Sequence, residues 1–320
     1  MSNIRLGIVG YGNLGRGAEA SIALNPDLEL AAVFSRRRLE HALYAPMDAI
    51  LEWKGKLDVL LLCGGSATDL PEQGPALAGH FHLVDSFDTH AKIPEYYAAV
   101  NAAAEQGGTL AVISTGWDPG LFSLMRVLGE AVLPQGHEYT FWGRGVSQGH
   151  SDAIRRVPGV RDARQYTIPS EAVLAQVRGG RNPALTTREK HTRLCYVVLE
   201  EGADAREVER AIVTMPNYFA DYDTTVHFIS AEELARDHAG LPHGGFVLRS
   251  GETAPGHQHL VEFQLKLDSN PEFTASVLTA YARAAFRLAQ RGEKGARTVF
   301  DIPIGLLSPR SAEDLRKHAL

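Results

Sequence analysis

Short, continuous apolar runs alternate with amphipathic stretches through the first third of the chain. The runs cover residues 4–9, 28–34, 57–63, 81–85 and 110–113, and each has the length of a strand that is buried on both faces. Helix-like patterns stand between them, such as residues 93–104, which are followed by Gly107 and Gly108. Strands that alternate with helices in this way predict a parallel sheet with helices on both of its faces.

The pattern changes after residue 118. Alternating apolar and polar positions cover residues 139–142, 166–168, 194–199, 224–229 and 259–267, which is typical of an antiparallel sheet with one solvated or ligand-facing side. A long helix pattern then opens at Asn270-Pro271 and places Phe273, Val277, Tyr281 and Leu288 on one apolar face. We expect this helix to return to the first domain.

These patterns predict an α/β fold with a doubly wound parallel sheet of the Rossmann type and a second α+β domain with a mixed or antiparallel sheet. The first domain should comprise residues 1–118 together with the returning helix at about residues 270–295, and the second should comprise residues 119–269. A chain of 320 residues is long enough for two domains.

The turn after the first predicted strand reads Gly10-Tyr11-Gly12-Asn13-Leu14-Gly15, a G-x-G-x-x-G pattern. Gly10 permits a tight turn, Gly12 lets the backbone approach a pyrophosphate, and Gly15 lets the following helix pack against the strand. The N-terminus of that helix offers unpaired N–H groups to phosphates. In the order strand, turn, helix, strand, the pattern predicts a dinucleotide site, whereas alone it would also fit a simple glycine-rich turn.

The end of the second predicted strand indicates which dinucleotide binds. An NAD site usually has a carboxylate there that accepts from the ribose 2′-hydroxyl. This chain has Ser35, Arg36 and Arg37 instead, and its next acidic residue is Glu40. Guanidinium groups bind a 2′-phosphate through charge-assisted hydrogen bonds, so the sequence predicts NADP(H). The alternative is that these arginines only solvate a loop.

Two further loops should lie at the same edge of the sheet, because parallel strands direct their carboxyl ends to one side. The first contains Ser66, Ala67, Thr68 and Asp69, and the second contains Asp85, Ser86 and Asp88. We expect the first to cover the cofactor, although it would also fit a plain strand-to-helix turn. The acids of the second loop would also fit N-cap positions.

Composition and charge exclude several classes of function. The formal net charge of −6 offers no basic face to nucleic acid. No apolar run approaches the roughly 20 residues of a membrane helix. Cys63 and Cys195 lie far apart without metal spacing, and residues 1–3 lead directly into a strand. We therefore expect reduced thiols and a cytoplasmic protein without a signal peptide.

One histidine pattern resembles part of a metal site. His257 and His259 form an H-x-H pair whose side chains would point to the same face of a strand. No third ligand of matching context accompanies them, and we predict no metal site.

Several motifs in combination resemble the meso-diaminopimelate dehydrogenase family. They are residues 9–16, 34–37, 65–69, 114–120, 141–143, 147–152, 242–245 and 267–271, so the similarity extends along nearly the whole chain. The family deaminates the D-configured carbon of meso-2,6-diaminopimelate oxidatively with NADP⁺, which yields L-2-amino-6-oxopimelate, ammonia and NADPH. The resemblance implies a homodimer that serves lysine and diaminopimelate biosynthesis, with the second domain for substrate binding and dimerisation.

The resemblance also implies individual site residues. Cofactor contacts fall on Gly10 to Gly15, Ser35 to Arg37, Ser66 to Asp69, and Asp85, Ser86 and Asp88. Substrate contacts fall on Asp88, Asp118, Trp142, Gln148, Gly149, Thr167, Arg193, His243 and Asn270. Arg144 departs from the family, which usually has proline at this position, and it leaves the rigidity of the loop and the substrate range open.

The chemistry of these side chains matches such a substrate. Diaminopimelate carries two carboxylates and two ammonium groups, so its pocket needs both signs of charge. Arg193 suits a carboxylate, and His243 could donate to one. Asp88 and Asp118 suit the reacting ammonium group, and either is a candidate for accepting its proton. Trp142 could form a wall of the pocket, although a core position is the alternative.

Two other functions remain compatible with the sequence. One is another NADP-linked oxidoreductase of two domains, of the dihydrodipicolinate reductase-like type, which acts on a cyclic imine. It would leave the ionic residues of the second domain unexplained. The other is a non-catalytic NADP(H) sensor, which needs only the first domain.

Overall fold

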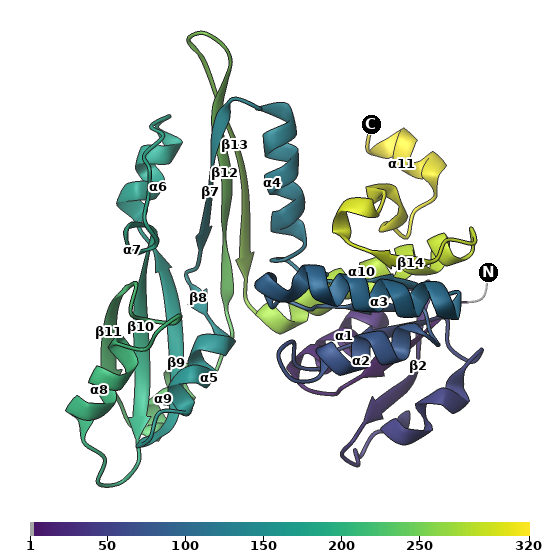
Figure 1. Ribbon diagram of the computed structural model, residues 1–320, viewed down its shortest axis with the longest axis horizontal. Coiled ribbons are helices and arrows are strands. Elements are labelled where there is room, and N and C mark those ends of the chain that lie inside the picture. Colours follow the sequence, from purple (N-terminus) through teal and green to yellow (C-terminus); the bar gives the residue numbers. More distant parts are fainter. Residues whose placement is uncertain (1–2) are drawn as a thin grey trace. The chain divides into compact units, whose positions relative to one another are not determined.

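The computed structural model describes residues 3–320, which form two compact units (Figure 1). Unit 1 comprises the described part of Met1–Leu124 together with Pro271–Leu320, and unit 2 comprises Met125–Asn270. Within residues 3–320, every helix is too short or too polar to cross a membrane.

Unit 1 contains a seven-stranded sheet with the strand order β14-β6-β5-β4-β1-β2-β3. Every strand pair in it is parallel. The strands are β1 (Ile4–Val9), β2 (Leu28–Ser35), β3 (Tyr44–Pro46), β4 (Val59–Leu62), β5 (Leu83–Asp85), β6 (Leu110–Val112) and β14 (Gly295–Arg297). The chain order reverses next to β1, and ligands of open α/β sheets bind at that point.

Helices cover both faces of this sheet, as the alternating apolar runs predict. On one face, α1 (Asn13–Ala23) and α10 (Asn270–Ala289) form a core with alternate residues of β1 and β4, including Ile8 and Leu61. On the other face, α2 (Leu70–Ala78) and α3 (Ile93–Gly107) pack on the intervening residues, including Leu60 and Leu62. The chain ends in α11 (Ala312–His318). The predicted Rossmann-type sheet is therefore confirmed.

Unit 2 contains two sheets. The four-stranded sheet has the order β11-β10-β9-β8, and the three-stranded sheet has the order β13-β12-β7. The four-stranded sheet is mixed, because β11 runs parallel to β10 whereas β9 is antiparallel to it. The strands are β7 (Gly136–Trp142), β8 (Gly145–Val146), β9 (Val160–Pro169), β10 (His191–Leu199), β11 (Asp223–Phe228), β12 (His243–Ala254) and β13 (His257–Leu267).

The helices of unit 2 are short, and they cover its sheets in part. Helices α5 (Gln148–Arg155) and α8 (Ala205–Val213) contribute Ile154, Val208 and Ile212 to a core with β9 and β10. Helix α6 (Glu171–Arg178) packs on β7 and β12. The remaining helices are α7 (Thr187–Lys190), α9 (Ala231–Asp237) and the part of α4 (Leu121–Val132) that belongs to unit 2.

Strand β12 is absent from the sequence prediction. Its residues from His243 to Gly251 are almost all buried, with β7 on one side and β13 on the other. A strand buried on both faces has no polar alternation, and Gly244, Gly245 and Gly251 remove side chains from the pattern. The sequence therefore lacks the period that marks a half-exposed strand.

Candidate functional site

The glycine turn of unit 1 leaves the start of helix α1 open to a ligand. Gly10 has φ +92°, a conformation that L side chains rarely adopt. A Cβ atom on Gly15 would lie 2.2 Å from the carbonyl oxygen of Gly10, so only glycine allows the helix to start this close to the turn. Gly12 is the N-cap, no side chain caps the helix, and no acidic residue stands in its first turn. The free N–H groups and the dipole therefore favour an anion here.

The residues that follow β2 carry the positive charge predicted for the 2′-phosphate. The Arg37 N–H donates to Ser35 Oγ (3.1 Å), and Arg36 Nη2 forms an ion pair of 2.6 Å with Asp69 Oδ1. The Arg36 side chain remains 74% exposed. Asp69 thus fixes the direction of Arg36 without withdrawing it from solvent, which leaves the guanidinium accessible to a phosphate.

The two predicted loops at this edge contact each other through Ser66. The Asp88 N–H donates to Ser66 Oγ (2.8 Å), which also lies 3.2 Å from Thr89 Oγ1. Asp69 Oδ2 accepts from the Gly65 N–H (2.9 Å). The loops after β4 and β5 therefore form one connected border. Three of its predicted site residues, Ala67, Thr68 and Asp88, are exposed.

Asp85, unlike Asp88 of the same loop, is buried. Its side chain is 0% exposed. Oδ1 accepts from the N–H groups of Phe87 and Ser114 (3.0 Å each), and Oδ2 accepts from the Tyr96 hydroxyl (2.6 Å). Burial raises the pKa of Asp85. The carboxylate therefore joins β5, β6 and α3 inside the protein, and this burial does not support a side-chain contact with a cofactor, so the predicted contact of Asp85 stays a prediction. Ser86, the next residue, is half-buried.

Asp88 and Asp118 both lie in unit 1, at the carboxyl ends of adjacent strands. Asp88 follows β5 and is exposed, whereas Asp118 follows β6 and is half-buried. The segment that carries Asp118 is held by Trp117, which packs edge-on against Phe122 at 5.2 Å and pairs with Gly120. The two candidate proton acceptors thus stand on separate loops that are both anchored in the sheet.

Arg193 lies at the centre of the site in unit 2. It is 6% exposed, its Nη1 donates to Thr167 Oγ1 on the neighbouring strand, and its guanidinium lies 3.8 Å from the ring centroid of Tyr222. Burial lowers the pKa of Arg193, and the groups that oppose this shift are Tyr222 and Cys195, neither of them a carboxylate. Its buried Nε has no hydrogen-bond partner within residues 3–320. A buried cation with an open donor calls for an anionic ligand.

His243 approaches this cation from another sheet. Gly145 on β8 pairs with Thr167, and a Cβ atom on Gly145 would lie 2.4 Å from the Cα atom of His243. His243 is buried, and its Nδ1 accepts from the Gly244 N–H (2.8 Å). Arg193 also pairs with Thr167, from the other side of β9. The close approach at Gly145 therefore places His243 in one row with Thr167 and Arg193 across the strands. The structure brings these three predicted residues together.

Helix α5 carries two more predicted residues to the same region. Gln148 and Gly149 form its first turn and are exposed, and no atom lies within 4 Å of a Cβ position on Gly149. The next residue, His150, was not predicted. Its pKa is lowered to about 4 by burial and by the charges of Arg193 and His243, so it is neutral at pH 7. The Gln165 N–H donates to Ser151 Oγ (3.0 Å), and this hydrogen bond fixes α5 beside β9.

Trp142 is positioned by a histidine that the sequence analysis missed. Its backbone N–H donates to His191 Nε2 (2.8 Å), and its ring stacks on the His191 ring at a centroid distance of 5.4 Å. Trp142 itself is half-buried. Because His191 is 1% exposed and packs against Phe141 as well, it fixes the end of β7.

Asn270 is half-buried too, and its N–H donates to the Leu241 carbonyl (2.9 Å).

Comparisons with known proteins agree with this arrangement. Residues 116–269 match the family model for the C-terminal domain of diaminopimelic acid dehydrogenase. The meso-diaminopimelate D-dehydrogenase of Ureibacillus thermosphaericus is 64% identical over 326 residues, with 100% of both chains covered. The enzyme of that name from Corynebacterium glutamicum is 48% identical over 317 residues, with 98% of each chain covered. The chain belongs to the meso-diaminopimelate D-dehydrogenase family.

Solved structures of this dehydrogenase family agree with the fold of this chain. The C. glutamicum DAP dehydrogenase in complex with DAP has a TM-score of 0.96 and 47% identity, with full coverage of both chains. An engineered D-amino acid dehydrogenase bound to NADP⁺ has a TM-score of 0.90 and 45% identity, again with full coverage of both chains.

Three residues that orient the predicted ones were not assigned to the site from the sequence, although one of them, His150, lies within the motif of residues 147–152. His150, His191 and Tyr222 contact or face Arg193 and Trp142 only because distant strands and helices pack together. None of them belongs to a spaced pattern.

Within residues 3–320 no group of three or more His, Cys, Asp or Glu side chains could hold a metal ion. His259 Nε2 lies 2.8 Å from Thr253 Oγ1.

His191 predicts a specific loss of stability in mild acid. Burial lowers its pKa from 6.5 to about 3, and Arg193 and Lys190 add to this shift. Below pH 6.5 the unfolded chain takes up a proton that the folded chain refuses, so stability decreases as the pH falls towards 3. At pH 5 this one group should reduce the free energy of unfolding by about 2 kcal/mol relative to pH 7. Urea unfolding of wild type and His191→Gln at both pH values measures the difference.

Glutamine can still accept from the Trp142 N–H but does not titrate. His191→Gln should therefore show a decrease between pH 7 and pH 5 that is about 2 kcal/mol smaller than in wild type. His318→Gln, at an exposed position of α11, is the control and should follow wild type. The same slope in all three proteins would mean that His191 is protonated in the folded state.

Proposed function

We propose that this protein catalyses the NADP-dependent oxidative deamination of the D-centre of meso-2,6-diaminopimelate, reversibly, to L-2-amino-6-oxopimelate and ammonia. The observation that carries this proposal is Arg193, a buried guanidinium with an open donor and no carboxylate partner among residues 3–320. A substrate carboxylate supplies that partner. Membership of the meso-diaminopimelate D-dehydrogenase family supports the same reaction.

The residues of unit 1 fit NADP. The open N-terminus of α1 behind Gly12 suits the pyrophosphate, and the exposed Arg36 with Arg37 suits the 2′-phosphate. Ser35, the residues from Ser66 to Asp69, and the segment of Ser86 and Asp88 border the same edge of the sheet. When bound, NADP⁺ would supply the acceptor for the hydride that leaves the substrate.

The substrate residues divide by charge. Arg193, His243 and Thr167 would hold the carboxylate at one end of diaminopimelate, because they form one row and Arg193 lacks an anionic partner. Gln148, Gly149 and Asn270 supply polar groups, and Trp142, fixed by His191, supplies a rigid apolar surface. Asp88 and Asp118 would bind the ammonium group of the reacting centre. The reaction requires all of these residues to act on one substrate molecule.

One of the two aspartates would accept a proton from the reacting ammonium group, since only the neutral amine can release a hydride from its carbon. The resulting substrate iminium then adds water and loses ammonia. Fixing both ends of the substrate contributes through orientation, by up to about 7–11 kcal/mol in ideal cases.

Asparagine variants identify the proton acceptor. Asp88→Asn and Asp118→Asn both keep the size of the side chain, and general-base catalysis is worth about 10²–10⁴-fold in rate. The variant of the true acceptor should lose that factor in kcat and lose the acidic limb of its pH–rate profile. The other variant should mainly raise KM for the substrate. Near-normal turnover and an unchanged profile would remove an aspartate from the role of base.

An assay of NADPH formation tests the proposed function against both alternatives. We expect turnover with meso-diaminopimelate, none with the LL isomer, which has no D-centre, and little with D-lysine, which lacks the second carboxylate. A reductase of a cyclic imine would oxidise none of the three compounds, and a non-catalytic sensor would bind NADPH without turnover. Absence of activity on meso-diaminopimelate would therefore disprove the proposal.

We also propose that the enzyme is a cytoplasmic homodimer that serves lysine and diaminopimelate biosynthesis, as in the family. Unit 2 supports self-association because Val127, Leu128 and Val132 of α4 are 48–52% exposed. Arg126 Nε of the same helix donates to Thr140 Oγ1 on β7 (3.0 Å), so α4 lies on the three-stranded sheet, and the edge strand β13 of that sheet exposes Leu260 and Val261 (39% and 38%). Exposed apolar residues on a helix and on the edge strand of the sheet that it covers are typical of an interface.

A charge on α4 tests the dimer. Leu128→Glu places a carboxylate in the proposed interface and should shift the protein to a monomer of about half the mass in light scattering. Leu24→Glu is the matched control, because Leu24 is 84% exposed and lies in unit 1. It should leave the mass unchanged. A Leu128→Glu protein with the wild-type mass would show that this face is free.

A further inference from the structure

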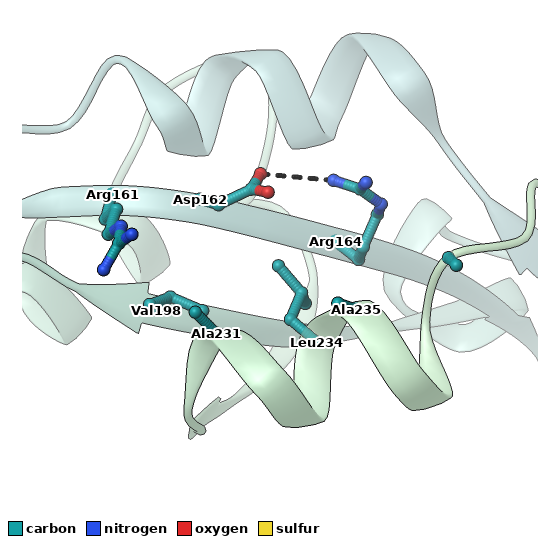
Figure 2. A pocket seen from close by; sticks show the side chains of 8 residues that line it. Arg161, Asp162, Arg164, Val198, Ala231, Leu234 and Ala235 are labelled. Atoms are coloured by element: carbon teal, nitrogen blue, oxygen red, sulfur yellow. Dashed lines mark hydrogen bonds and ion pairs between the residues drawn. The ribbon is translucent and has the colours of Figure 1, made fainter.

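A cavity of about 440 Å³ lies in unit 2 between α9 and the strands β9 and β10 (Figure 2). Successive side chains of a strand point to opposite faces. Ala163 packs in the core with α5 and α8, and Thr167 holds Arg193 on that same face, whereas Arg164 lines the cavity. The cavity therefore lies on the face of the sheet opposite to the proposed substrate residues, and the proposed reaction gives it no role.

A β-bulge adds a charged side chain to this cavity. On β10, Val198 pairs with Asp162 and the next residue, Leu199, pairs with Val160, so Arg161 is the extra residue. Val160 and Ala163 both pack in the inner core, and the two residues between them, Arg161 and Asp162, both line the cavity. Bulges redirect a side chain in this way, and they are enriched at ligand sites.

Both arginines of the cavity have unused donors. Within residues 3–320 Arg161 makes no hydrogen bond or ion pair, although Glu232 of α9 is within reach of its charge. Arg164 forms its hydrogen bonds through Nη1 only, to Asp162 Oδ1 (3.2 Å) and to the Ala163 carbonyl (2.9 Å). Its Nε is buried without a partner in the described chain, and its side chain is 23% exposed.

Asp162 does not neutralise these two guanidinium groups. It is the one acid among the lining residues, and it also accepts from Arg155 Nη1 (3.4 Å). The Asp162 carboxylate therefore accepts from both Arg155 and Arg164, and among residues 3–320 it has no hydrogen bond or ion pair with Arg161. The cavity keeps positive charge at its β9 side (Figure 2).

The remaining lining is apolar. It consists of Val198 on β10, Ala231, Leu234 and Ala235 on α9, and Ala239. In Figure 2 the labelled α9 side chains lie along one side of the lining and the Asp162–Arg164 pair along the other. The alanines leave room where larger side chains would fill the space. The volume is in the range of sites for small organic ligands.

We infer that this cavity is a second ligand site, which binds a small carboxylate with an apolar tail. The carboxylate binds to the open guanidinium edges of Arg161 and Arg164, and the tail lies against Leu234 and the alanines of α9. Two guanidinium groups against one carboxylate do not suit a cation, and the apolar wall does not suit a purely polar molecule. The site is separate from the substrate site, because its residues lie on the opposite face of β9.

Hexanoate is the probe for this site, with 1-hexanol and acetate as comparisons. Ligand-detected NMR titration of the full-length protein should give saturable binding of one hexanoate per chain. Acetate lacks the tail and 1-hexanol lacks the charge, so each should bind at least fivefold more weakly. No saturable binding of hexanoate would overturn the inference.

Two variants place the probe in the cavity. Arg161→Met, at an exposed position, should weaken hexanoate at least fivefold, and Ala235→Trp should abolish binding by filling the space. Arg210→Met, an exposed arginine on α8 that does not line the cavity, should bind as wild type does.

Hexanoate could instead occupy the substrate site, and Arg193→Met separates the two cases. The inference predicts that Arg193→Met binds hexanoate normally, whether or not the enzyme is active on diaminopimelate. Loss of binding in Arg193→Met with normal binding in Arg161→Met would assign the probe to the substrate site and overturn the inference. A protein that fails for lack of folding is recognised by its circular dichroism, and Arg161→Met and Ala235→Trp test the site independently of each other.

Discussion

Arg193→Met should reduce kcat/KM for meso-diaminopimelate by about 10²–10³-fold while leaving the protein as stable as wild type. Truncating one partner of a buried charge pair costs about 2–5 kcal/mol of binding, and about 3–4 kcal/mol within this range corresponds to the expected loss. In the described part of the chain the guanidinium has no carboxylate partner and an unsatisfied Nε, so a methionine of similar length removes a desolvated charge. Such replacements are often neutral or stabilising.

The combination of the two results is what distinguishes binding from structure. Steady-state kinetics and urea unfolding should be measured on the same preparation, with Arg210→Met as the control for loss of an arginine. We expect Arg193→Met to keep the free energy of unfolding within about 1 kcal/mol of wild type. A variant that loses stability and activity together would show that Arg193 supports the fold through Thr167 and Tyr222 and is not a carboxylate receptor.

Replacing Arg36 and Arg37 together by alanine should raise KM for NADP⁺ by about 10²–10⁴-fold and change KM for NAD⁺ by less than about threefold. Each charge-assisted hydrogen bond to the 2′-phosphate contributes about 1.5–3 kcal/mol, and NAD⁺ has no such phosphate. Arg36 is available for this contact, because its side chain stays 74% exposed although it forms an ion pair with Asp69. Initial rates with both coenzymes give the two constants.

Arg38→Ala is the control for this double variant, because Arg38 is exposed and follows the same strand. This variant should leave the preference for NADP⁺ over NAD⁺ within about threefold of wild type, since Arg38 is not one of the residues proposed to bind the 2′-phosphate. Equal effects of the double variant on both coenzymes would show that Arg36 and Arg37 do not touch the 2′-phosphate.

The sequence predicted those features whose physical cause is local. Strand β1, the glycine turn, helix α1 and strand β2 follow one another within about thirty residues, and each has its own pattern. The fold class, the family and NADP as the family's coenzyme were all predicted and are confirmed. Arg36 was assigned from its place after β2, and the structure shows it accessible there.

Features that depend on distant contacts could not be predicted. Asp85 looked like a loop acid, but its burial depends on Tyr96 in α3 and on the Ser114 N–H after β6. His191 and Tyr222 act on Trp142 and Arg193 from other strands and loops. Strand β12 has no alternation because both of its faces are covered. In each case the missing information is which segments pack together.

In the proposed reaction, hydride leaves the D-configured carbon of a substrate whose carboxylate is bound by Arg193. The most direct measurement uses two samples of meso-diaminopimelate, one deuterated at the D α-carbon and the other at the L α-carbon, with mass analysis of the NADPH formed. We predict deuterium in the coenzyme, together with a primary isotope effect in single turnover, from the D-labelled sample only. Deuterium transferred from the L-labelled sample would contradict the account.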